Sequence, residues 1–95
     1  GEGGFNPIQA AAAQWLRQLC DQHGIVLIAD EVQTGFARTG KMFACEHLGL
    51  QPDLITMAKS MAGGTTLSAV SGKLAIVNHA TLECTAWGLE PVCHN

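Results

Sequence analysis

Two charged residues, Asp30 and Lys59, each follow a short apolar stretch, and their types suit the binding of a charged ligand. Asp30 comes after "IVLIA" at residues 25–29, and Lys59 comes after "LITMA" at residues 54–58. A short apolar run of this kind is typical of a buried strand. If both runs are parallel strands of one sheet, the acid and the amine share an edge, and a ligand would lie between them. A solvated turn residue is the alternative interpretation at either position.

A helix is predicted before the first strand. Asn6 and Pro7 are preferred residue types for the N-cap and the first helical position, and Gly24 is a typical left-handed stop after His23. Apolar residues at helical spacing predict the buried face, with Trp15 in the core. The residues of this face are Ile8, Ala12, Trp15, Leu16 and Leu19.

Three strands are predicted, over residues 25–29, 54–57 and 67–71. The first is apolar on both faces, which is typical of a central strand in a parallel sheet. A short helix closed by Gly49 is expected over residues 42–48. Helix, strand, connection and strand in this order indicate an α/β fold with an open, mostly parallel sheet, in which ligands bind beyond the carboxyl ends of the strands.

The composition excludes several classes of protein. At 95 residues the chain is one domain at most, and its 47% hydrophobic and 14% charged residues suit a mostly interior part of a larger α/β protein. A net charge of -3 with scattered basic residues argues against nucleic-acid binding, and the apolar runs are too short to cross a membrane. The four cysteines form no CxxC pair, which favours reduced thiols and a cytoplasmic location. No metal site is expected, although Cys84, Cys93 and His94 come nearest to one.

One motif points to a different class of protein. Residues 35–42, "GFARTGKM", nearly match the phosphate-binding pattern G-x-x-x-x-G-K-[ST] of nucleotide hydrolases. Met42, however, stands where a hydroxyl must hold Mg²⁺, and the motif follows the acidic strand instead of preceding it. We therefore favour an interpretation in which Arg38 holds this loop in place and Lys41 is solvated. Lys73, outside the loop, is also expected to be solvated.

Three stretches, taken together, resemble one family. They are "GEGGF" at residues 1–5, "LCDQHGIVLIADEVQTGFARTGKMFACEHLGLQPDLITMAKSMAGG" at 19–64 and "LSAVSGK" at 67–73. They are similar to the class III aminotransferases that use pyridoxal 5′-phosphate, and the loop "GFARTGKMFA" resembles the 4-aminobutyrate branch. The resemblance implies that the chain is a central part of the large domain of a fold type I, pyridoxal-phosphate-dependent transferase.

The same resemblance implies a role for each matching residue. Lys59 would be the catalytic amine that binds the cofactor covalently, and Asp30 would be the carboxylate that faces its pyridine nitrogen. Val32 would pack on one face of the ring, and Gln33 would hydrogen-bond its phenolic oxygen. Glu2 resembles a substrate-side glutamate, with the capping of a glycine-rich turn as the alternative. An amine that loses its proton near neutral pH and a fixed carboxylate suit this chemistry.

The implied activity is the transfer of an amino group from an ω-amino acid such as 4-aminobutyrate to a 2-oxo acid such as 2-oxoglutarate, by a homodimer or larger assembly. The resemblance covers residues 1–78, expected to belong to the cofactor-binding domain, and residues 79–95 form a divergent tail. The alternatives are a non-catalytic remnant that binds no cofactor, and an acetylornithine- or ornithine-type aminotransferase. The chain alone is expected to be inactive, because other parts of such a site lie outside it.

Overall fold

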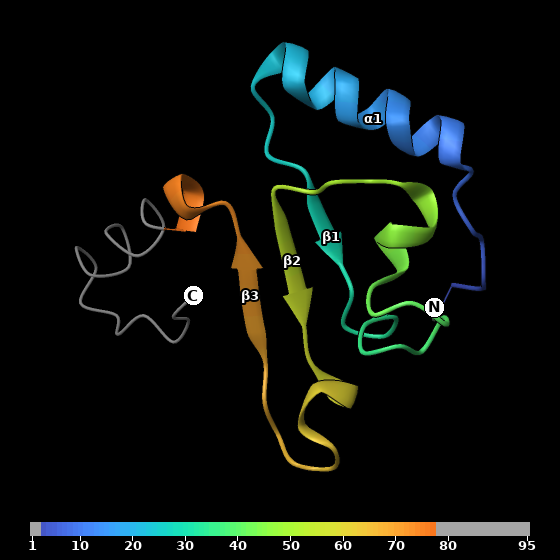
Figure 1. The fold of residues 1–95 in the computed structure, drawn as a ribbon, viewed down its shortest axis with the longest axis vertical. Helices are drawn as coiled ribbons and strands as arrows, with labels where there is room; N and C mark the ends of the chain where they lie inside the picture. Colours follow the sequence, from blue (N-terminus) through green and yellow to red (C-terminus); the bar gives the residue numbers. More distant parts are fainter. Residues whose placement is uncertain (1–2, 78–95) are drawn as a thin grey trace.

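A three-stranded sheet forms the centre of the structure, a computed structural model that describes residues 3–77 (Figure 1). The elements are, in chain order, α1 (Ala10–His23), β1 (Ile28–Asp30), the 3₁₀ helix η1 (Ala44–Leu48), β2 (Leu54–Met57), the 3₁₀ helix η2 (Lys59–Ala62) and β3 (Ala69–Gly72). Glu2 and the tail from residue 78 lie outside the described residues. The arrangement is α/β, as the sequence predicted.

Helix α1 begins later than predicted and ends where predicted. The start at Asn6 and Pro7 is wrong, because Gln9 is still extended and serves as the N-cap. The helix begins with the run of four alanines, the residue type with the highest helix propensity. Gly24 ends it in the left-handed conformation, with φ +63°, and its N–H donates to the carbonyl oxygen of Cys20, which confirms the predicted stop. With 14 residues, α1 is the longest helix in residues 3–77, and none there is long and apolar enough to cross a membrane.

The buried face of α1 differs from the predicted one. Ala13 and Cys20 are buried, whereas Trp15 is 60% exposed, so its assignment to the core is wrong. Polar contacts explain the difference: the side-chain amide of Gln14 donates to the carbonyl oxygens of Leu48 and Gly49 at 3.0 and 2.9 Å. These hydrogen bonds turn the small residues of α1 toward η1 and leave the indole outside.

The sheet has the strand order β1-β2-β3, with β2 in the centre. β1 runs parallel to β2, with Asp30 opposite Thr56, and β3 runs antiparallel to β2, with Met57 opposite Ala69. β1, which its apolar sequence predicted to be central, therefore lies at an edge of the described sheet. The described sheet is mixed because η2 and residues 63–68 reverse the chain without a crossover helix.

Strand β1 is shorter than its apolar run and poorly covered. The N–H of Ile25 donates to Cys20 at the end of α1, and the N–H of Leu27 donates to the side chain of Asp53, so neither N–H bonds to β2, although the carbonyl oxygen of Leu27 accepts the N–H of Leu54. Ile25 and Ile28 are 52% and 54% exposed. Residues 3–77 therefore leave about half of each of these two residues uncovered, which agrees with a chain that is mostly interior to something larger.

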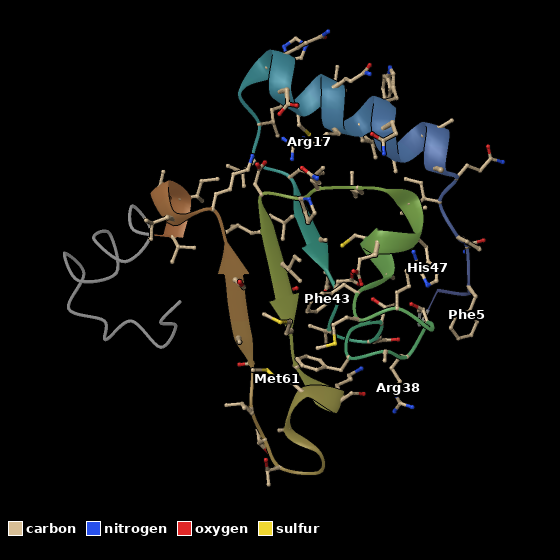
Figure 2. All side chains as sticks on the ribbon, in the orientation of Figure 1. Phe5, Arg17, Arg38, Phe43, His47 and Met61 are labelled. Carbon is tan, nitrogen blue, oxygen red and sulfur yellow. The ribbon has the colours of Figure 1, made fainter. Side chains whose placement is uncertain are left out.

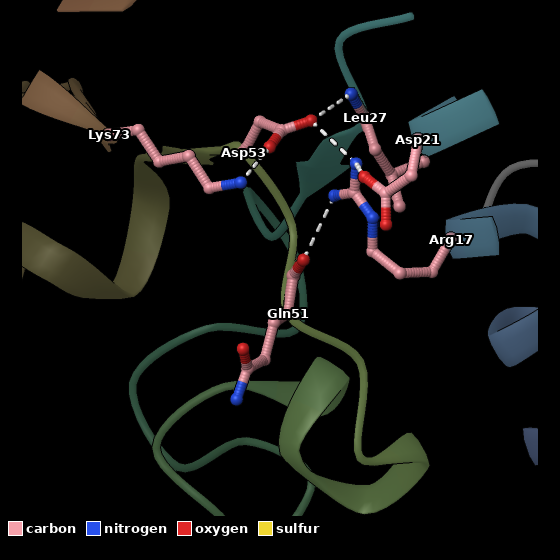
Figure 3. A network of polar contacts seen from close by, with 6 residues as sticks. All are labelled: Arg17, Asp21, Leu27, Gln51, Asp53 and Lys73. Atoms are coloured by element: carbon pink, nitrogen blue, oxygen red, sulfur yellow. Dashed lines mark hydrogen bonds and ion pairs between the residues drawn. The ribbon is translucent and has the colours of Figure 1, made fainter. Parts of the chain in front are cut away.

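A buried carboxylate, Asp53, joins α1, the segment before β1 and the residue after β3 (Figure 3). Its Oδ2 atom accepts hydrogen bonds from Arg17 at 3.0 Å and from the N–H of Leu27 at 2.8 Å. Its Oδ1 atom lies 2.6 Å from Nζ of Lys73, which is exposed, as predicted, but also forms an ion pair that the sequence did not indicate. The hydrogen bond from Leu27, with those from Lys73 and Arg17, holds the pKa of Asp53 well below its usual range despite burial.

Replacing Asp53 with asparagine is expected to lower the free energy of unfolding by about 2 kcal/mol, because hydrogen bonds to charged groups contribute roughly 1.5–3 kcal/mol. The folded-state pKa of Asp53 lies below its ordinary value of 3.8. Its stabilisation is therefore complete above that value and is lost as the pH falls toward the folded-state pKa. Urea unfolding should show a larger difference in the free energy of unfolding between the wild-type protein and Asp53→Asn at pH 7 than at pH 3.

Asp21→Asn is the matched control for this measurement, because Asp21 is an exposed carboxylate paired with the same Arg17 at 2.7 Å. It should change the stability much less than Asp53→Asn, since exposed ion pairs contribute little. Equal effects of the two variants, or an Asp53→Asn effect independent of pH, would contradict the role given to the buried carboxylate.

Candidate active site

The carboxyl ends of the parallel strands β1 and β2 lie next to each other at one end of the sheet, called the carboxyl-end edge below. Both charged residues singled out in the sequence lie at this edge. Asp30 is the last residue of β1 and lies opposite Thr56 of β2. Lys59 begins η2, separated from the end of β2 only by Ala58. Because the strands are parallel, their carboxyl ends point the same way. The structure thus brings the acid and the amine to one edge, as predicted.

Asp30 is exposed, and one of its carboxylate oxygens is held in place. Oδ1 accepts a hydrogen bond from the hydroxyl of Thr56 at 3.0 Å and another from the N–H of Val32 at 3.2 Å. No described residue donates to Oδ2, which leaves it for another partner. A carboxylate oriented before a ligand arrives is what electrostatic stabilisation of a ligand charge requires.

An open hollow of about 540 Å³ lies beside Asp30, a volume in the range of small-molecule sites. Its lining residues are Phe5, Asp30, Val32, Gln33, Thr34, Arg38 and Thr39. The hollow thus brings together three of the predicted cofactor-binding residues, Asp30, Val32 and Gln33. Lys59 is not among the lining residues, and Glu2 lies outside the described part of the chain.

The backbone at this edge adopts conformations that residues other than glycine seldom take. Lys59 has φ +48°, and Phe36 and Ala37 have φ +61° and +66°. Within residues 3–77 these are the residues other than glycine with positive φ, and all three follow the carboxyl end of β1 or β2. Such strain costs on the order of 1–3 kcal/mol per residue and concentrates at functional sites. At Lys59 it sets the direction in which the side chain leaves the backbone.

The loop of residues 34–43 is anchored on two sides. Nε of Arg38 donates a hydrogen bond of 2.9 Å to Oγ of Ser60 in η2, so the loop after β1 is tied to the segment after β2. Nε2 of His47 lies 2.9 Å from the carbonyl oxygen of Thr39. Figure 2 shows Arg38 and His47 on the same side of the molecule, next to this loop. The prediction that Arg38 ties down the loop is confirmed, and Arg38 also lines the hollow.

Glu31, the second acid at the end of β1, had no role in the sequence interpretation and is only 3% exposed. Oε1 accepts hydrogen bonds from the hydroxyl of Thr34 and, at 3.0 Å, from the N–H of Ala44; Oε2 accepts one from the N–H of Cys45 at 3.0 Å. Burial by itself raises the pKa of Glu31, but these hydrogen bonds outweigh it and keep the pKa below its usual value. The two adjacent acids thus have different surroundings: Asp30 lies at the open edge and Glu31 inside the loop.

The buried thiol of Cys45, next to Glu31, is a poor nucleophile. Burial, and then the neighbouring Glu31, raise the pKa of Cys45 to about 11, so its thiol stays protonated at neutral pH. Cys20 and Cys45 are both free thiols. Residues 3–77 contain no group of three or more histidine, cysteine or acidic side chains arranged to hold a metal ion. The tail cysteines and histidine considered as ligands lie outside the described residues.

The loop "GFARTGKM" lacks the structure of a phosphate-binding loop. It leads into η1, a 3₁₀ helix of five residues, where a phosphate loop is followed by the N-terminus of an α-helix. Lys41 is exposed, as expected, and Met42 is 47% exposed. This geometry argues against a nucleotide hydrolase.

The fold and the site define an α/β protein that carries an acid and an amine at the carboxyl ends of two parallel strands. Residues 1–93 match the family model for aminotransferase class-III, so the chain belongs to the class III aminotransferases. This confirms the resemblance seen in the sequence. The proposed division of the chain near residue 78 stays a prediction.

Individual relatives agree with the family. The chain is 59% identical over 78 residues to a 5-aminovalerate aminotransferase of Pseudomonas aeruginosa and 55% identical over 78 residues to a 4-aminobutyrate aminotransferase of Escherichia coli. Each match covers 82% of this chain, and the chain spans 18% of either relative. A crystal structure of N-acetylornithine aminotransferase from Stenotrophomonas maltophilia matches with a TM-score of 0.71 and 39% identity, over 77% of this chain and 20% of that one. The predicted fold class is thereby confirmed.

Proposed function

We propose that the chain is part of a longer aminotransferase dependent on pyridoxal 5′-phosphate, called the parent enzyme below. The observation that carries the proposal is the shared sheet edge, where Asp30 keeps one carboxylate oxygen free and Lys59 follows the neighbouring strand in a left-handed conformation. Membership of the class III family supports it, and so do the half-exposed Ile28 of β1 and Ile25 before the strand. The parent enzyme would transfer an amino group from an ω-amino acid to a 2-oxo acid.

The residues around the hollow suit this cofactor. When bound, the cofactor supplies an electron-withdrawing ring that stabilises negative charge on the substrate carbon. Asp30 would place Oδ2 against the ring nitrogen and keep that nitrogen protonated. Val32 would pack on one face of the ring, and Gln33 would hydrogen-bond the phenolic oxygen. The position of all three side chains along one hollow supports these roles.

Lys59 would bind the cofactor covalently through Nζ and, once released from it, carry a proton between the nitrogen-bearing carbon of the substrate and a carbon of the cofactor. Both roles need an amine that loses its proton near neutral pH, which burial favours. Lys59 is exposed within the described residues, so its covering would come from other parts of the parent enzyme. Glu2 would contact the substrate from the start of the chain.

Two of the relatives are named for ω-amino acids of different length, 4-aminobutyrate and 5-aminovalerate, at similar identity. We propose 4-aminobutyrate as the donor and 2-oxoglutarate as the acceptor. The acetylornithine type is the second candidate, because a structural relative has that activity in its name. We further propose a homodimer or larger assembly in the cytoplasm, where Cys20 and Cys45 stay reduced.

Three amino donors distinguish these possibilities in the purified parent enzyme. Adding pyridoxal 5′-phosphate should give a visible absorption band, and 4-aminobutyrate with 2-oxoglutarate should then yield glutamate. The same assay with 5-aminovalerate and N-acetylornithine ranks the donors by kcat/KM. A parent protein that develops no band and forms no glutamate with any donor would overturn the proposal and favour a non-catalytic remnant.

The isolated 95-residue chain is expected to form no glutamate from 4-aminobutyrate and 2-oxoglutarate. Its hollow is open and Lys59 is exposed, so water has free access to both. The half-exposed Ile25 and Ile28, before and within β1, also favour aggregation through this edge strand. The purified chain and its Lys59→Ala variant should therefore give equal, background rates of glutamate formation with added pyridoxal 5′-phosphate. Lys59-dependent glutamate would mean that the chain builds a working site by itself.

A further inference from the structure

Glu31 joins the two ends of the loop that walls the hollow. Thr34 stands at the start of the loop and Ala44 and Cys45 follow its end, and all three donate hydrogen bonds to the Glu31 carboxylate. The carbonyl oxygen of Glu31 also accepts the N–H of Gly35 at 2.9 Å. A Cβ atom on Gly35 would come within 2.8 Å of that oxygen, so the turn has no room for a side chain. Glu31 therefore holds the two ends of the loop together through its side chain and holds Gly35 through its backbone carbonyl. These contacts are called the clamp below.

This clamp lies one residue away from Asp30. Successive side chains along an extended chain point to opposite faces, so Asp30 reaches the open edge while Glu31 reaches the interior of the loop. Arg38 and Thr39, which lie between the clamped ends, line the same hollow as Asp30. A movement of Glu31 would therefore displace the acid on one side of the hollow and the loop on the other.

We infer that Glu31 is a positioning residue of the proposed site: it fixes the direction of Asp30 and the wall of the hollow without itself touching cofactor or substrate. The inference rests on the proposed function. It accounts for a feature that the family resemblance left without a role, namely a fully engaged, buried carboxylate directly after the carboxylate of the site.

The donors around Glu31 require a carboxylate. An ionised carboxylate only accepts hydrogen bonds, and the N–H groups of Ala44 and Cys45 approach different oxygens of the side chain. A glutamine of the same shape would turn its amide NH₂ toward one of these two N–H groups in either orientation. One buried backbone N–H would then lose its partner, and the loop would have to move to regain one.

Glu31→Gln in the parent holoenzyme tests the inference, with Glu46→Gln as the matched control. Glu46 also accepts a backbone N–H next to η1, from Phe43 at 2.9 Å, but it has no link to β1. Glu31→Gln should lower kcat by about 10²-fold, as small misplacements of a site do, with the KM for the amino donor nearly unchanged. It should also shift the pH dependence of the cofactor's absorption band and speed hydrogen exchange at Ala44 and Cys45. Glu46→Gln should leave the band and kcat at wild-type values.

The outcomes separate this inference from the proposed function. If the wild type shows the band, and Glu31→Gln changes the band and kcat no more than Glu46→Gln does, the inference alone is overturned. A wild-type protein without a band would overturn the proposed function and this inference with it. If Glu31→Gln does not fold, Thr34→Val is the second variant, because it removes one donor and keeps the carboxylate. It should shift the pH dependence of the absorption band and lower kcat by a smaller factor than that expected for Glu31→Gln. An unchanged band and kcat in Thr34→Val would then contradict the positioning role.

Discussion

The parent enzyme with Lys59 replaced by alanine should hold no covalently attached cofactor and should show no measurable transamination. The chain contains two other lysines, and neither is placed to substitute. Lys41 lies exposed on the loop after β1. Lys73 follows Gly72, which pairs with the first residue of β2, so it stands at the opposite edge of the sheet and is bound to Asp53. Trapping the covalent adduct with borohydride and mapping the labelled peptide measures the site of attachment.

Lys73→Ala provides the control for this experiment. It removes an amine of the same type and should keep the covalent cofactor, while lowering stability through the loss of the pair with Asp53. A borohydride label on Lys41 or Lys73 in the wild type, or a retained label in Lys59→Ala, would refute the assignment of Lys59.

Asp30→Asn should keep the cofactor but lower kcat by about 10²–10³-fold, the usual effect of removing one preorganised electrostatic contact. Asparagine can still accept the hydrogen bonds from Thr56 and Val32, so the strand end should keep its shape. It carries no negative charge, however, and cannot keep a bound ring nitrogen protonated. The variant should therefore separate the charge of Asp30 from its structural contacts.

Cofactor content, from absorption after denaturation, and kcat are the two measurements needed for Asp30→Asn. Asp21→Asn, at an exposed carboxylate on α1, should match the wild type in both. Turnover near the wild-type value in Asp30→Asn would return Asp30 to the alternative interpretation, a turn residue at the end of a strand.

The sequence predicted those features of the fold that are determined by residues close together in the chain, such as helix ends and the bounds of a strand. The left-handed stops at Gly24 and Gly49 were predicted because a glycine after a helical pattern adopts positive φ at little cost, and both do so. The strand over residues 54–57 matches β2 at both ends. The acid and the amine at one edge also followed from local reasoning, because parallel strands align their carboxyl ends.

Contacts between distant residues decided what the sequence could not predict. The face of α1 depends on hydrogen bonds from Gln14 to η1, which a hydrophobic pattern does not contain. The ion pair of Lys73 depends on Asp53, twenty positions earlier in the chain. Glu31 was not recognised because its donors at Ala44 and Cys45 come from the other end of a loop. A buried acid among backbone N–H groups is visible only once the chain has folded.

The strand connections described above also imply an order in which the site is assembled. Residues 58–68 connect β2 with β3, whereas the connection of residues 31–53 between β1 and β2 is about twice as long. Each doubling of a loop adds roughly 0.6 kcal/mol to its closure, and contacts close in the sequence form fastest. We therefore expect the β2–β3 hairpin to form first and β1 to dock onto it later. The strand that leads to Lys59 would then serve as the template on which Asp30 is brought into position.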